Sequence, residues 1–128
     1  MLTVIENVVD LGHLKNLCHL KVTTTYGRDA SWLLRLIESI SLPSRIEEIH
    51  VNIDAPYVVS RSWAQLDTLL SSSHFPQLSI FNIEVLYLLC LDPVTIYHME
   101  ENTPRLWAKG VLSLYTHLDR HVQHRKLD

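Results

Sequence analysis

The sequence predicts an α/β fold, namely a short repeat solenoid of about four parallel strands with helices on one, convex side. Two observations carry this prediction. A strand-like motif returns along the chain at nearly constant spacing, and helical patterns fill the intervals between its copies. Within each copy apolar and polar residues alternate, so that one face of the predicted sheet is apolar and the other is polar.

The clearest copy of the motif spans residues 46–53, where Ile49, Val51 and Ile53 alternate with polar side chains. The matching positions in the four copies are Leu20, Ile49, Phe81 and Leu112. Each of these positions follows the one before it by about 30 residues. A period of this length is typical of a repeat protein in which each repeat contributes one strand.

At the N-terminus, residues 2–11 place apolar side chains on one helical face, and Gly12 follows as a helix stop. We therefore predict a short helix there, followed by a first strand over about 18–24. That strand is expected to be the N-terminal edge of the sheet, and its unpaired backbone groups favour self-association of the chain. The next helix is predicted to follow Asp29 as its N-cap.

Two further helices are predicted between the later strands. Ser62 and Gln65 match a capping box, which predicts Ser62 as the N-cap of a helix. Asp92 followed by Pro93 indicates an N-cap and a first helical residue. The apolar side chains expected to face the core from these two helices are Trp63, Leu66, Leu69, Leu70, Val94, Tyr97 and Met99.

The alternative architecture is a doubly wound sheet with helices on both faces. Parallel strands that are buried on both faces are almost continuously apolar. The predicted strands are not, because polar residues alternate outward in each, such as His50 and Asn52 in the second strand. The sequence therefore favours a leucine-rich-repeat-like solenoid over residues 1–116, followed by a polar tail over 117–128.

Composition limits the classes of function and the compartment. The 128 residues are 47% hydrophobic with a net charge of −3, and no basic patch suggests nucleic-acid binding. The longest apolar run, 85–91, is too short to cross a bilayer. Positions 1–25 contain no basic segment of a secretory signal, and Cys18 and Cys90 are expected to be buried free thiols. We expect an intracellular protein, cytoplasmic or nuclear, with no membrane partner.

Two motifs carry a resemblance to a known family. The first is 63–70, Trp-Ala-Gln-Leu-Asp-Thr-Leu-Leu, followed by Phe-Pro-Gln-Leu at 75–78; the second is Thr-Pro-Arg-Leu at 103–106, followed by Gly110 and a short apolar strand. In this order, over about residues 14–116, they resemble the C-terminal leucine-rich-repeat region of the F-box proteins of mushroom-forming fungi.

The resemblance implies a substrate-recruiting or scaffolding repeat domain, which the full-length relatives tether to a ubiquitin-ligase core through an N-terminal F-box. No F-box stretch precedes the repeats in this chain, so the resemblance implies a truncated form. The corresponding function is a protein–protein interaction module that binds another protein.

The polar face of the sheet is the predicted binding surface. Mixed polar side chains on a rigid sheet suit reversible recognition of a protein. Two cross-strand columns carry the predicted partner-binding residues: Lys21, His50, Asn82 and Ser113 in one, and Thr23, Asn52, Glu84 and Tyr115 in the other.

Catalysis is not predicted. The chain has no P-loop, no dinucleotide-binding glycine pattern and no helical His-Glu-x-x-His motif, so we expect neither an enzyme nor a cofactor. Ser71-Ser72-Ser73-His74 lacks the glycine-flanked turn that exposes a nucleophilic serine.

An alternative function is a small metal-binding or metal-dependent enzyme domain built on the C-terminal histidines. His117, His121 and His124 are spaced i, i+4, i+7, so a helix would place all three on one face, as a zinc site requires. No carboxylate or cysteine completes this set of ligands, so we expect a solvated tail and no metal.

Overall fold

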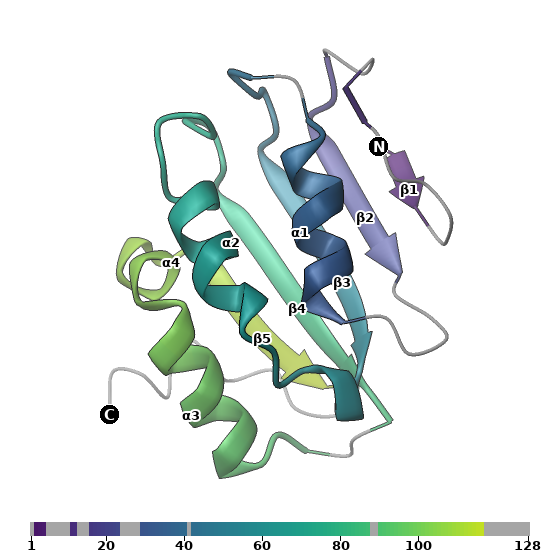
Figure 1. Cartoon of the computed structure of the whole chain (residues 1–128), viewed down its shortest axis with the longest axis vertical. Coiled ribbons are helices and arrows are strands. Elements are labelled where there is room, and N and C mark those ends of the chain that lie inside the picture. Colours follow the sequence, from purple (N-terminus) through teal and green to yellow (C-terminus); the bar gives the residue numbers. More distant parts are fainter. Residues whose placement is uncertain are drawn as a thin grey trace.

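The chain forms one parallel sheet whose strands are arranged in sequence order. The computed structural model describes residues 2–4, 11–12, 16–23, 29–40, 42–87 and 90–116. Within these ranges the sheet has five strands, and every neighbouring pair is parallel (Figure 1). The strands are β1 (Leu2–Val4), β2 (His19–Thr23), β3 (Glu48–Asp54), β4 (Ile80–Leu86) and β5 (Leu112–Thr116).

The strand register agrees with the spacing of the sequence motif. Leu20 lies opposite Ile49, Ile49 opposite Phe81, and Phe81 opposite Leu112. Each of these four side chains is fully buried. The predicted repeat of about 30 residues is therefore the distance along the chain that brings equivalent positions side by side in the sheet.

The N-terminus differs from the prediction. Residues 2–4 form strand β1, which pairs with β2, instead of the start of a helix over 2–11. The strand predicted over 18–24 is β2, which spans 19–23. It is an inner strand of the described sheet, in which β1 takes the edge position. A short apolar segment fits helix and strand periodicity alike, and pairing with an existing strand decided between them. Residues 5–10 lie outside the described part of the chain.

The helices lie on one face of the sheet (Figure 1). They are α1 (Ala30–Glu38), α2 (Ser62–Leu70), α3 (Pro93–Asn102) and α4 (Pro104–Lys109), with one 3₁₀ turn, η1 (Ala55–Tyr57). The strand side chains that point toward the helices form the core together with the inner faces of the helices. Those on the opposite side are mostly half-buried, so along each strand buried and partly exposed residues alternate with the period of two expected from the sequence.

Helix α1 begins at the predicted cap. The backbone N–H of Ser31 donates to Asp29 Oδ1 at 2.9 Å, and the hydroxyl of Ser31 donates to the same oxygen at 2.5 Å. These bonds, that of the hydroxyl foremost, lower the pKa of the Asp29 carboxyl below its ordinary value of 3.8. Asp92 caps α3 in a similar way by accepting the Thr95 N–H at 2.9 Å.

Loss of the α1 cap should destabilise the protein in a pH-dependent way. Asp29→Ala is expected to cost about 1 kcal/mol at pH 7, because one N-terminal N–H loses its acceptor. A carboxyl whose pKa is lower in the folded state stabilises that state above pH 3.8, its ordinary pKa, and loses this contribution as the pH falls through the folded-state value. Urea unfolding of both proteins at pH 7 and pH 3 measures the difference, which should shrink at the lower pH.

Two predictions about the later helices are wrong: the N-cap of α2 and the residues of α3 that face the core. Arg61, and not Ser62, precedes α2, and the Ser62 N–H donates to the Ser60 hydroxyl at 3.2 Å. In α3 the predicted inward residues Val94 and Tyr97 are 68% and 64% exposed, whereas Met99 is buried as predicted. At about 100° per residue, Val94 and Tyr97 lie roughly 140° and 160° around the helix from Met99, so the three cannot share one face.

A buried carboxylate joins two helices that are far apart in the sequence. Asp67 of α2 is only 3% exposed. Its two oxygens accept backbone N–H groups at the start of α4, from Arg105 at 3.2 Å and from Leu106 at 2.8 Å. Thr103, the residue before α4, provides no side-chain cap. Asp67 therefore caps α4 from another helix and connects segment 63–70 to segment 103–106.

The cysteines are free, as predicted, but neither is buried. Cys18 is half-buried and Cys90 is exposed. Each lies just outside a regular element, beyond the alternating apolar positions that enter the core. Among the described helices, none is both long enough and apolar enough to span a membrane.

Candidate functional site

The polar face of the sheet brings together the eight residues that the sequence predicts as a binding surface. We call these eight residues the open face. The register places Lys21 opposite His50, His50 opposite Asn82, and Asn82 opposite Ser113. One step of two residues farther along the strands lies the second column: Thr23, Asn52, Glu84 and Tyr115. Both predicted columns are thus confirmed as cross-strand neighbours, and whether they bind a partner remains a prediction.

The open face owes its position to the alternation within each strand. Lys21 is exposed and the other seven residues are half-buried, while the intervening side chains are almost completely buried. Strand backbones hold these side chains at fixed spacings of about 4.8 Å between strands and about 6.7 Å along them. The face is therefore a rigid and polar surface.

At one end of the open face, a network of side-chain contacts links His19 on β2, Glu48 and His50 on β3, and Asn82 on β4. Glu48 lies between two histidines: His50 Nε2 is 3.0 Å from Glu48 Oε1, and His19 Nε2 is 3.6 Å from Glu48 Oε2. The other ring nitrogen of His50, Nδ1, is 3.2 Å from Asn82 Nδ2. Because a carboxylate only accepts, His50 Nε2 donates to Glu48 and Nδ1 then accepts from the Asn82 amide. These two hydrogen bonds fix the orientation of the His50 and Asn82 side chains.

His19 and Glu48 lie on this side of the sheet but are not among the eight predicted binding residues. The sequence could have placed Glu48 on this side of the sheet, because Glu48 lies two positions before His50 and its side chain therefore points the same way from the strand. The pairing of His19 with Glu48 needs the strand register as well.

A hollow of about 270 Å³ lies on the open face and is lined by five of its residues: Lys21, His50, Asn52, Glu84 and Tyr115. The hollow runs from β2 to β5. Its lining combines an ammonium group, a carboxylate, an imidazole, an amide and a phenol ring. Such groups can bind charged and polar side chains, and we regard this hollow as the candidate interaction site.

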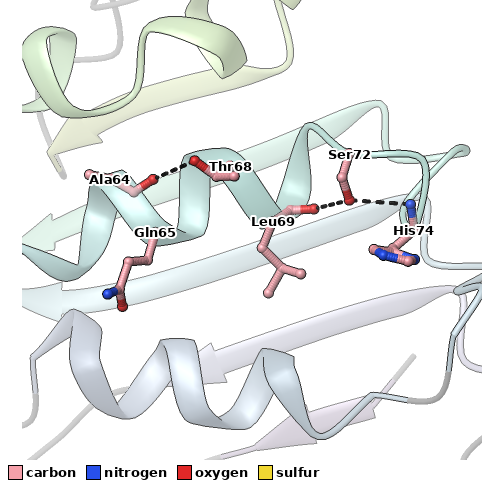
Figure 2. A pocket seen from close by; sticks show the side chains of 6 residues that line it. All are labelled: Ala64, Gln65, Thr68, Leu69, Ser72 and His74. Carbon is pink, nitrogen blue, oxygen red and sulfur yellow. Dashed lines mark hydrogen bonds between the residues drawn. The ribbon is translucent and has the colours of Figure 1, made fainter.

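A second hollow lies on the helical side of the molecule, along α2 and the turn after it (Figure 2). It measures about 620 Å³ and is largely apolar, and its lining residues are Ala64, Gln65, Thr68, Leu69, Ser72 and His74. Two of the hydroxyl groups drawn there bond to the local backbone: Thr68 donates to the Ala64 carbonyl, and Ser72 donates to the Leu69 carbonyl. The backbone N–H of His74, not its ring, donates to the Ser72 hydroxyl at 3.2 Å.

Metal binding has no support within the described part of the chain. There, no group of three His, Cys, Asp or Glu residues is arranged so that it could hold a metal ion. His117, His121 and His124 lie outside the described residues. The zinc hypothesis stays a prediction, which the zinc content after chelation and reconstitution would check.

Comparisons with known proteins provide no relative to guide the choice of function. No family model, no curated protein and no solved structure matches this chain.

Proposed function

We propose that the chain is a protein–protein interaction module and that the open face is its binding surface. The observation that carries this proposal is a parallel sheet with helices on one face and ordered polar side chains on the other. Parallel sheets are usually covered on both faces. A rigid, half-buried and polar face, with side chains in cross-strand columns, suits recognition of another protein.

We further propose that the architecture is a short leucine-rich-repeat-like solenoid, resembling the substrate-recruiting repeat region of an F-box ubiquitin-ligase adaptor. The equivalent buried positions at intervals of about 30 residues support it, as does the use of one strand per repeat. The bond from Asp67 to the start of α4 gives the two family motifs a shared structural role.

Self-association through the N-terminal edge remains part of the proposal, with β1 in place of the strand at 18–24 as the edge. An edge strand presents backbone donors and acceptors to another chain. Light scattering over a range of concentrations would detect it, and a chain that stays monomeric throughout would contradict it.

The binding proposal predicts that a bulky charge on the open face abolishes partner capture. Asn52→Arg, at the centre of the face, should reduce the recovered amount of a partner by about tenfold or more, because the longer side chain fills the hollow and its guanidinium can pair with Glu84 directly opposite. The measurement is quantitative affinity capture with the tagged full chain, with ubiquitin-ligase subunits scored separately.

Gln65→Arg is the matched control, because it adds the same charge to the exposed side of α2. Partners that are retained by this control and lost by Asn52→Arg would support the open face. Partners lost only by Gln65→Arg would instead identify the hollow of Figure 2 as the binding surface.

A further inference from the structure

Two opposite charges line the hollow of the open face without pairing with each other. Both ion pairs within the described residues involve Glu48, and the side chains of Lys21 and Glu84 have no hydrogen bond or ion pair with any described residue. Glu84 is nevertheless half-buried. A partly desolvated carboxylate without an internal partner has the most to gain from an external cation.

The strand register explains why these two charges stay apart. Lys21 lies on β2 and Glu84 on β4, so β3 separates them, and Glu84 also lies one step farther along the strands. Two strand spacings across the sheet and one such step along it amount to about 12 Å. His50 and Asn52 of β3 occupy the floor between them.

The residues around Glu84 indicate which kind of cationic side chain it would bind. Tyr115 is its direct neighbour on β5 and lines the same hollow. A carboxylate beside an aromatic ring suits a guanidinium group, which can form two hydrogen bonds with the carboxylate and stack on the ring. At the other end, the exposed ammonium of Lys21 complements a carboxylate.

We propose that the hollow binds a segment of another protein that presents an arginine to Glu84 and Tyr115 and an acidic side chain to Lys21. This inference rests on the proposed function of the open face and specifies the chemistry of the partner. The separation of the two charges matches two side chains of one extended segment, since four residue steps span about 13 Å.

Three blocked five-residue peptides test this proposal by NMR titration of the ¹⁵N-labelled chain: Glu-Ser-Gly-Ser-Arg, Glu-Ser-Gly-Ser-Glu and Arg-Ser-Gly-Ser-Arg. The wild type is expected to bind the mixed peptide about fivefold more tightly than either of the others, as one matched surface ion pair implies. The largest shifts should map to residues that line the hollow.

Two charge reversals should change the preference in opposite directions. Glu84→Lys makes both ends basic and should favour the peptide with two glutamates, whereas Lys21→Glu makes both ends acidic and should favour the peptide with two arginines. Glu38→Lys is the control, because Glu38 is exposed on α1 and this variant should keep the wild-type preference.

A wild type that binds no peptide, binds all three equally, or shows shifts away from the hollow would overturn the inference. The same holds if Glu84→Lys or Lys21→Glu keeps the wild-type preference while its amide spectrum stays folded. If these results occur while Asn52→Arg still abolishes partner capture, the open face binds its partner through other chemistry. Failure of both experiments would reject the proposed function itself.

Discussion

Replacing Phe81 by alanine is expected to destabilise the protein by about 3–5 kcal/mol. Phe81 is completely buried at the centre of the sheet, between Ile49 on β3 and Leu112 on β5. Its ring lies 6.4 Å from that of Trp63, centroid to centroid, and so joins the sheet to α2. Removing the ring loses both the transfer free energy and the packing around the cavity that remains. Urea unfolding, with the midpoint and slope compared, measures the loss.

The neighbouring residue provides the control. Asn82→Ala, one position along β4 and on the open face, should cost less than about 1 kcal/mol, mainly the bond with His50. The stability loss expected for Phe81→Ala is a large part of a typical free energy of unfolding, so this variant could fail to fold. In that case Phe81→Leu, which keeps part of the side-chain volume, should show a smaller loss of stability in the same direction. Equal effects at 81 and 82 would contradict the register, since a slip by one residue exchanges the two faces.

Asp67→Ala should cost about 2–4 kcal/mol, which is large for a polar residue. The carboxylate accepts two backbone N–H groups of α4 and is almost completely buried. Alanine leaves both N–H groups without this acceptor at a helix start that has no cap of its own. Bonds to a charged group contribute about 1.5–3 kcal/mol each, although the two are not additive. Thermal or urea unfolding measures the loss.

Two variants separate the cap from the general effect of a change in α2. Asp67→Asn keeps an acceptor oxygen and should recover part of the stability. Thr68→Ala alters the adjacent exposed residue and should stay within about 0.5 kcal/mol of the wild type. If Asp67→Ala were as stable as Thr68→Ala, the link between α2 and α4 would not contribute to folding.

The open face was predictable from sequence because its residues follow from two local rules. Alternation within a strand decides which side chains share a face, and the intervals of about 30 residues decide which strand positions lie opposite each other. Lys21, His50 and Asn82 needed nothing further to be placed in one column. The cap at Asp29 is equally local, since it involves a residue only two positions away.

Only the tertiary structure determined the conformation and the buried face of short apolar segments, and the partners of charged groups that lie far apart in the sequence. Residues 2–4 became a strand because β2 offered a backbone to pair with, and Val94 and Tyr97 became exposed because Met99 took the core side of α3. The pattern of a short segment fits more than one face, so packing selects among them. Asp67 accepts hydrogen bonds from residues 38 and 39 positions away in the sequence, and the hollow between Lys21 and Glu84 needs three neighbouring strands, so both features exist only once the chain has folded.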